Sequence, residues 1–179
     1  PDSFVTLLDA RTDGALTPLA PRRRRIEFIG DSITSGEGVR GPRSFMEWLP
    51  MCFSASDNYT RLTAEQLHAD VQVVSQSGWG VVCGWNNDPR ANLPAVYDLV
   101  CGPVAIEAAP GGARGGEKPY AFDFDPDTIV VNLGTNDSNA LSQPAFTVPG
   151  TGETFCFTQA DIPAFEDACL RFLLHLQQK

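Results

Sequence analysis

The sequence predicts an α/β fold built around a parallel β-sheet. Three short apolar segments, residues 25–29, 71–75 and 128–133, have the composition of buried strands. Segments with helix-capping residues, or with apolar side chains at helical spacing, lie between these strands and after the last one. Strands that alternate with helices favour a parallel sheet.

The predicted strands differ in how clearly their composition identifies them as strands. Residues 25–29 alternate weakly between apolar and charged side chains and end at Gly30. Residues 128–133 are nearly continuous in apolar, β-branched side chains, which is typical of a strand covered on both faces. We therefore expect residues 128–133 to be buried on both sides of the sheet.

Capping residues predict two helices. Asp57 is interpreted as the N-cap of a helix that runs to about residue 68. The apolar residues available for its buried face are Leu62, Ala64 and Leu67. Asp161 is interpreted as the cap of the last helix, with Pro163 in its first turn. One face of that helix is expected to hold Ile162, Phe165, Cys169, Phe172 and Leu176.

The remaining segments are expected to be loops, because glycine and proline are frequent in them. Residues 36–56 and 78–92 form two long connections, and a short helix is expected at residues 93–100. Residues 102–124 are predicted to form an exposed insertion. Residues 4–8 have an extended pattern.

Composition excludes several classes of function. The 179 residues suit one domain and carry a net charge of −9, with a pI of about 4.5. Such a surface repels phosphate backbones, so no nucleic-acid partner is expected, and the basic run at residues 22–25 is interpreted as a solvated linker. No apolar run is long enough to cross a bilayer, so no membrane partner is expected. The 5 cysteines show neither a C-x-x-C pair nor zinc-like spacing to histidine, so no metal site is predicted.

Three polar segments follow the three predicted strands. They are residues 30–34 (Gly-Asp-Ser-Ile-Thr), 77–80 (Ser-Gly-Trp-Gly) and 134–137 (Gly-Thr-Asn-Asp). The carboxyl ends of parallel strands meet at one edge of a sheet, where ligands bind. A serine that follows a buried strand, such as Ser32, can project its hydroxyl from the first turn of a helix, where backbone N–H groups stabilise negative charge.

In their order and placement, these segments resemble the motif blocks of the SGNH (GDSL-like) hydrolase superfamily. The resemblance implies that Ser32 is the nucleophile of a serine esterase. It also implies an oxyanion hole made by the backbone N–H groups of Ser32 and Gly78 and by the side-chain amide of Asn136. No cofactor is expected.

Residues 26–34 and 77–80, with Gly-Glu-Gly at 36–38, are similar to carbohydrate esterase family 2. This resemblance implies a three-layer αβα sandwich with a mostly parallel sheet, incomplete here at its C-terminal end. It implies acetyl-ester hydrolysis on plant polysaccharides such as xylan or mannan, with an acetylated carbohydrate as the partner. Residues 1–21 would be the end or remnant of a preceding β domain or a linker, and residues 22–179 the N-terminal part of the hydrolase domain. Secreted and cytoplasmic locations are both compatible with the sequence.

Each candidate residue also has a structural alternative. Ser32 could cap a helix, while Gly78 and Asn136 could serve turns. Asp31 is expected to support the first segment rather than to act on the substrate. Trp79 has two alternative roles, as a core residue or as a surface that stacks on a sugar ring.

Three other sequence motifs are excluded by the residues in or around them. The Gly-x-Gly-x-x-Gly pattern at 36–41 does not follow a strand directly, and Pro42 disrupts the helix that a dinucleotide site requires. Residues 30–36 lack the lysine of a phosphate-binding loop. Thr34 occupies the place of the second glycine of an α/β-hydrolase elbow.

A serine nucleophile needs a base, and the sequence offers no suitable histidine. The resemblance implies a late Asp-x-x-His block, whereas this chain has only His68, at the end of the first predicted helix, and His175, within the last. We therefore expect the catalytic histidine to come from polypeptide beyond Lys179 or from a second polypeptide, and residues 1–179 alone to be inactive. The alternative is a non-catalytic relative that binds a glycan or a protein partner.

Overall fold

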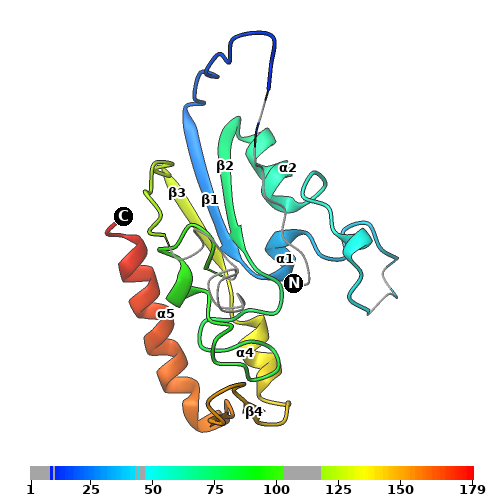
Figure 1. Cartoon of the computed structure of the whole chain (residues 1–179), viewed down its shortest axis with the longest axis vertical. Helices are drawn as coiled ribbons and strands as arrows, with labels where there is room; N and C mark the ends of the chain where they lie inside the picture. The colour runs from blue at the N-terminus through cyan, green and yellow to red at the C-terminus, as the bar shows by residue number, and fades with distance from the viewer. Residues whose placement is uncertain (1–8, 10, 43, 45–46, 103–117) are drawn as a thin grey trace.

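Three parallel strands form the central sheet of the computed structural model, which describes residues 9, 11–42, 44, 47–102 and 118–179. β1 (Arg24–Gly30) lies between β2 (Ala69–Ser75) and β3 (Thr128–Asn132) (Figure 1). All three predicted strands are present, and each predicted end lies within two residues of the observed one. The parallel order β2-β1-β3 confirms the predicted α/β fold.

The central strand carries a buried carboxylate. Glu27 is 2% exposed, although its charge gave β1 its weak alternation. The Gln72 side-chain amide donates to one carboxylate oxygen and the Tyr97 hydroxyl to the other, both at 2.7 Å. Burial and the bond to Glu27 raise the pKa of Tyr97, so this phenol stays protonated and keeps donating. A carboxylate fits inside the sheet because both of its oxygens are hydrogen-bonded.

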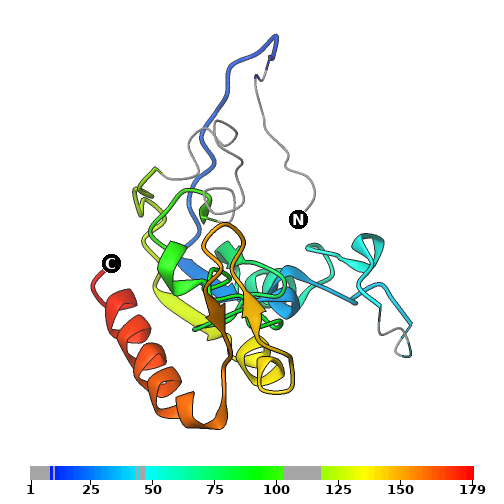
Figure 2. The same cartoon turned by 60° about the horizontal axis from the view of Figure 1, so that its bottom comes forward.

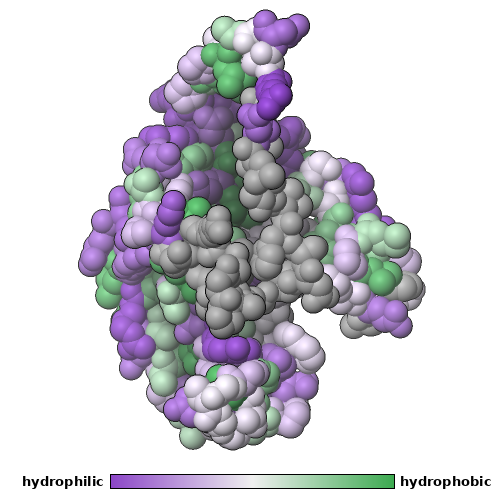
Figure 3. Space-filling model, in the orientation of Figure 1, coloured by the Kyte–Doolittle hydropathy of each residue, from purple (hydrophilic) through white to green (hydrophobic). Residues whose placement is uncertain are grey.

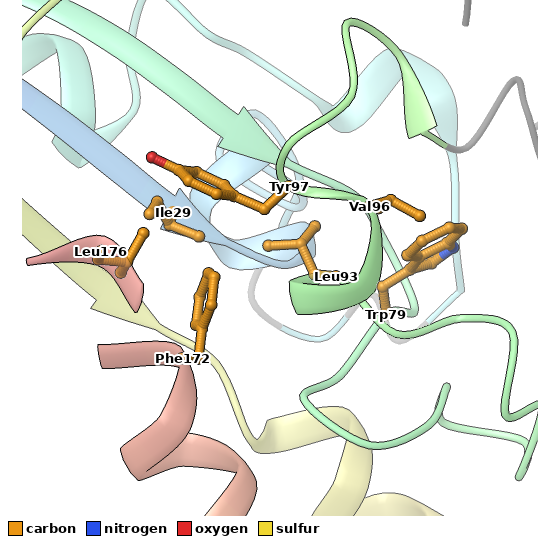
Figure 4. Packing of buried hydrophobic residues seen from close by; sticks show 7 residues of the cluster. All are labelled: Ile29, Trp79, Leu93, Val96, Tyr97, Phe172 and Leu176. Carbon is orange, nitrogen blue, oxygen red and sulfur yellow. The ribbon is translucent and has the colours of Figure 1, made fainter. Parts of the chain in front are cut away.

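Helices cover both faces of the sheet. α2 (Tyr59–Gln66) packs on the face that presents Ile26 and Phe28. α5 (Ile162–Leu176) packs on the opposite face, over the larger core cluster. Figure 4 shows the residues of that cluster: Ile29, Trp79, Leu93, Val96, Tyr97, Phe172 and Leu176. Helix, sheet and helix thus form the αβα arrangement that the family resemblance implied.

The start and the buried face of α2 differ from the prediction. Asn58, not Asp57, is the N-cap, and its side-chain oxygen accepts from the first N–H of the helix. Ala64 is buried as predicted, but Leu62 and Leu67 are 48% and 41% exposed. Leu62 lies on the opposite side of the helix from Ala64, because two residues correspond to more than half a turn. The side chains of α2 that meet the sheet are therefore Ala64 and the ring of Tyr59, which packs edge-to-face against Phe28.

β3 is less covered than its composition predicts. Val130 is 36% exposed, so the expectation that residues 128–133 are buried on both faces is wrong. α2 packs over β2, and within the described part of the chain no helix covers the Val130 side of β3. The α5 side of the strand is better protected, since Ile129 and Val131 pack against the larger core cluster.

The last helix begins with a capping box. The Thr158 N–H and hydroxyl both donate to the Asp161 carboxylate, at 2.8 and 2.7 Å. Asp161 occupies the N-cap position of α5 that the sequence predicted, but its carboxylate accepts from Thr158 and caps no N–H of α5, and the turn η3 (Gln159–Asp161) precedes the helix. The predicted apolar face is confirmed, because Phe172 and Leu176 are buried in the core.

Long loops connect these elements. The only described turn of helix in the connection after α1 (Ser32–Ser35) is η1 (Pro50–Cys52), and the helix expected at 93–100 is reduced to η2 (Pro94–Val96). The segment predicted to be extended, residues 4–8, lies outside the described residues, as does most of the predicted insertion, residues 103–117. The described residues of 9–23 form no helix and no strand and are exposed.

The chain after β3 forms a compact flank. α4 (Thr135–Ala140) follows the strand, and the hairpin of β4 (Phe146–Thr147) and β5 (Thr154–Phe155) lies beside it (Figure 2). Among the described helices, none combines the length and the apolar character needed to cross a bilayer.

Asn58→Ala should lower the free energy of unfolding by about 1–3 kcal/mol. The buried Asn58 amide donates to the Thr34 carbonyl at 2.7 Å, so its loss leaves that carbonyl without a donor and α2 without its cap. Urea unfolding measures the change. Asn139→Ala is the control, since Asn139 is exposed and makes no side-chain hydrogen bond with the described residues. Equal losses in the two variants would contradict a specific role for the buried amide.

Candidate active site

The first polar segment places Ser32 at the start of α1, directly after β1. A Cβ on Gly30 would lie 2.0 Å from the Thr34 hydroxyl oxygen, so the chain can turn this tightly into α1 only with glycine at that position. The Asp31 carboxylate caps the helix by accepting from the Ile33 N–H at 3.0 Å. Ser35 donates to the Ser75 hydroxyl at 2.8 Å, which ties α1 to the end of β2. Ser32 is half-buried.

The second segment brings Gly78 to the same edge. The Gln76 N–H donates to the Gly30 carbonyl at 3.1 Å, so the chain after β2 stays beside the end of β1. Gly78 has φ of +78°, a conformation that glycine adopts without strain. Its carbonyl accepts from the Trp85 N–H at 3.0 Å, and the Trp85 ring lies beside its α-carbon. Gly78 therefore serves a turn, as its structural alternative stated, and also lies beside the first segment.

The third segment contributes Asn136 from the first turn of α4. This side chain is 6% exposed, and its amide nitrogen donates to the Trp79 carbonyl at 2.8 Å. A second, longer contact of 3.4 Å runs from the same nitrogen to the Asp31 carboxylate. Asn136 thus joins all three polar segments.

Ser32, Gly78 and Asn136 line one cavity of about 1030 Å³. The cavity lies at the carboxyl ends of the parallel strands, where ligands bind in open α/β sheets. The surface is hollowed between the lobe formed by residues 36–58 and the lower part of the molecule, which carries α4 (Figure 3). The structure therefore brings together the three residues that the sequence selected from separate parts of the chain.

Two backbone donors at this edge are unused. Among the described residues, neither the Ser32 N–H nor the Gly78 N–H has a hydrogen-bond acceptor, and the Ser32 hydroxyl has no partner there either. An arrangement of a free hydroxyl and free N–H groups can bind an oxyanion that forms on an ester carbonyl attacked by the hydroxyl.

Asp137, the neighbour of Asn136, holds the second segment in place. Its buried carboxylate accepts from the backbone N–H groups of Val81, Val82 and Cys83, at 2.8, 2.7 and 3.2 Å. The sequence does not identify this role of Asp137, because nothing in the spacing reveals which distant N–H groups a carboxylate will meet. Burial also raises the pKa of the Cys83 thiol to about 12, so this thiol is not a competing nucleophile.

Asn87 fixes the rest of the loop at residues 78–92. It is fully buried with φ of +67°, and its amide donates to the carbonyls of Ala140, Gln143 and Pro144. Its side-chain oxygen accepts from the Phe157 N–H at 2.8 Å. Sequence analysis assigned no role to this residue. The loop is thus bound to the end of α4 and to the segment after β5.

At the cavity, Trp85 is exposed whereas Trp79 is buried. Trp79 also lines the cavity, but it is 6% exposed and packs in the larger core cluster, which favours its core alternative over stacking on a sugar. Trp85 is 50% exposed, lines the cavity and lies against Gly78. The only feature of the sequence that could have identified Trp85 as a cavity residue is that polar residues follow it in a predicted loop.

Asp31 has a supporting position, as expected. Its side chain is 1% exposed. Burial raises the pKa of its carboxyl, the hydrogen bond from the Ile33 N–H opposes this shift, and the nearby charge of Asp137 adds to it. The carboxylate is thus held by α1 and Asn136 rather than presented to a substrate.

Neither histidine of the sequence lines the cavity. His68 is exposed and lies between α2 and β2 with φ of +51°. His175 is on α5, where its imidazole is hydrogen-bonded to the Asp98 carboxylate at 2.9 Å. The 179 residues therefore place no histidine base beside Ser32.

Asp137→Asn should lower the free energy of unfolding by about 1–3 kcal/mol. An amide group replaces one accepting oxygen with a donor that faces backbone N–H groups, so at least one of the three bonds is lost. Thermal or urea unfolding measures the effect. Asp167→Asn, an exposed position on α5, is the matched control and should change stability by less than about 0.5 kcal/mol. A loss no larger than that of the control would show that the three bonds do not hold the loop.

Known proteins resemble the chain in sequence and in structure, although no family model matches it. An acetylxylan esterase / glucomannan deacetylase of Cellvibrio japonicus is 33% identical over 126 residues, 67% of this chain and 31% of the relative. An acetyl xylan esterase from the rumen bacterium Butyrivibrio proteoclasticus has a TM-score of 0.79 and 43% identity, over 93% of this chain and 46% of that one. A carbohydrate esterase family 2 enzyme of Corynascus thermopiles (Myceliophthora fergusii) has a TM-score of 0.63 and 30% identity, over 94% and 45%.

The chain spans less than half the length of these relatives. In each of them the matched region is part of one longer chain, which gives no support to a separate second polypeptide as the source of a histidine. The similarity confirms the resemblance inferred from residues 26–34 and 77–80. The chain belongs to carbohydrate esterase family 2, within the SGNH hydrolases.

Proposed function

We propose that the protein is a serine esterase that removes acetyl groups from plant polysaccharides such as xylan or mannan. The observation that supports this most strongly is that Ser32, Gly78 and Asn136 line one cavity, where the Ser32 hydroxyl and the N–H groups of Ser32 and Gly78 have no hydrogen-bond partner among the described residues. The relatives named acetylxylan esterase and glucomannan deacetylase support the choice of acetyl esters and of polysaccharides.

The reaction begins when the Ser32 hydroxyl oxygen attacks the carbonyl carbon of the acetyl ester. The negative charge that develops on the carbonyl oxygen is stabilised by the Ser32 and Gly78 N–H groups. The sugar hydroxyl then leaves with a proton, and the acetyl group remains on Ser32 as an acyl-enzyme. Water hydrolyses this intermediate and releases acetate.

Asn136 supplies the third donor in this proposal. Its amide nitrogen uses one N–H on the Trp79 carbonyl at 2.8 Å, which orients the side chain. The other N–H makes only the 3.4 Å contact with Asp31. We propose that the substrate oxyanion replaces this long contact, because a hydrogen bond to a charged oxygen is the stronger of the two.

The proton of Ser32 needs a base, and we propose that a histidine outside these 179 residues provides it. Both histidines of the chain are placed elsewhere, His68 on the surface and His175 on Asp98. The matched region is less than half of each relative, which leaves room for such a residue in the longer proteins.

The cavity favours a sugar over a long acyl chain. The exposed ring of Trp85 offers a flat apolar surface for the ring of a sugar. Hydroxyl groups of the sugar can bond to the polar side chains that line the same cavity, which include Asn86, Asp88, Asn139 and Gln143.

A second candidate function is glycan binding without turnover. The observation that favours it is the absence of a histidine beside Ser32 among the residues described. The two functions differ in their dependence on Ser32, because binding alone needs no nucleophile.

Ser32→Ala should abolish hydrolysis of 4-nitrophenyl acetate by the complete protein, because the acyl-enzyme cannot form. Release of nitrophenol, followed by absorbance, measures turnover. Ser138→Ala, at an exposed position on α4, is the control and should retain the activity. Undiminished turnover by Ser32→Ala would end the esterase proposal, and a complete protein that binds xylan without any turnover would favour the second function.

Asn136→Ala should lower kcat by roughly a hundredfold to a thousandfold, as the loss of one oxyanion donor does. KM should change much less, because the charge that Asn136 stabilises exists only in the transition state. Steady-state kinetics on 4-nitrophenyl acetate separate the two constants. An effect on KM alone would make Asn136 a binding or turn residue, and urea unfolding of the variant controls for the lost bond to Trp79.

A further inference from the structure

A second exposed tryptophan lines the cavity of Ser32. Trp48 is 56% exposed and belongs to a different loop from Trp85. A tryptophan that lines a cavity offers a large, rigid surface, and such residues are enriched among those that dominate binding. We propose that Trp48 is a platform for the polysaccharide main chain, which binds sugar units away from the one that carries the acetyl ester. This inference rests on the proposed function and extends it to the length of substrate that the site recognises.

The ring of Trp48 has a fixed neighbour. It packs edge-to-face with Phe53, with ring centroids 5.8 Å apart and an interplanar angle of 68°. Phe53 also lines the cavity. The turn η1 between them is closed by two backbone bonds, from Cys52 to Leu49 at 3.0 Å and from Phe53 to Pro50 at 3.1 Å. The aromatic pair therefore forms a local unit rather than two separate side chains.

The loop that carries this unit is tied back to α1. The Ser54 N–H donates to the Gly36 carbonyl at 3.1 Å, and the Arg40 N–H donates to the Cys52 carbonyl at 3.2 Å. The Arg40 guanidinium also pairs with the Asp57 carboxylate at 2.6 Å. These bonds set the position of Trp48 relative to the helix of Ser32 before any ligand arrives. Such preorganisation reduces the entropy that binding must overcome.

Two aromatic surfaces on two loops suit a chain of sugars. The described part of the loop that carries Trp48 projects away from the body of the molecule, whereas the loop of residues 78–92, which carries Trp85, stays near α4 (Figures 1 and 2). The cavity of about 1030 Å³ is at the upper end of ordinary small-molecule sites, far larger than an acetyl group requires. A polysaccharide that crosses Ser32 can contact both loops.

The platform predicts a dependence on ligand length. In the Ser32→Ala protein, Trp48→Ala should weaken the binding of xylohexaose by about fivefold or more, and that of xylobiose by less than about twofold. Isothermal titration calorimetry with these unacetylated ligands measures both affinities without any turnover. Trp48→Phe should retain most of the xylohexaose affinity, because it keeps an aromatic face. Met51→Ala is the control, since Met51 is 81% exposed in the same loop but does not line the cavity.

Three results would overturn the platform. They are an unchanged xylohexaose affinity in Trp48→Ala, an equal loss for both ligands, and no binding of xylohexaose by the protein that keeps Trp48. None of them depends on whether Ser32 is a nucleophile, because that is decided by the hydrolysis of 4-nitrophenyl acetate. Thermal unfolding of Trp48→Ala shows whether the variant keeps the stability of the parent protein. An unchanged melting temperature means that the weaker binding comes from the missing indole and not from a disrupted loop.

Discussion

The buried carboxylate of Asp137 is the interaction on which the geometry of the site depends. It draws three consecutive backbone N–H groups of the loop after Gly78 onto α4, at 2.7–3.2 Å. Its neighbour Asn136 reaches the Trp79 carbonyl of the same loop and contacts Asp31, the residue before Ser32. Two adjacent residues of α4 thereby fix the loop of Gly78 against the helix that carries Ser32. The sheet brings the segments to one edge, and this carboxylate sets how they face one another.

The sequence predicts most of the fold, and it selects three residues that line one cavity in the structure. Ser32, Gly78 and Asn136 each follow a strand of clear composition, and a parallel sheet places the ends of those strands together. What the sequence could not show is which role each aromatic residue takes. Trp79 and Trp85 lie in the same loop and both line the cavity, and only the packing of Trp79 in the core cluster beside Val96 and Leu93 makes Trp85 the exposed one (Figure 4).

The errors of the sequence analysis have a common physical cause. Asp57 and Asp161 are both good capping residues, but each carboxylate is hydrogen-bonded to another side chain or N–H instead of capping the predicted helix. Asp57 is drawn to Arg40, which leaves the cap of α2 to Asn58. The burial of Val130 likewise depends on what packs over β3 and not on its own composition. Local pattern predicts that an element exists, and tertiary contacts decide its ends and its buried side.

Asn58 has a further consequence for how the protein is produced. It begins Asn-Tyr-Thr, the acceptor sequence for N-linked glycans. In the folded protein its amide nitrogen is buried and donates to the Thr34 carbonyl, so a glycan attached to that nitrogen has no space beside α1. A eukaryotic secretory pathway that modifies the chain before it folds would therefore prevent α2 from docking. Expression in a host without this modification, or with Thr60→Val to remove the acceptor sequence, avoids the conflict, although Thr60 is itself buried and the replacement loses its hydroxyl.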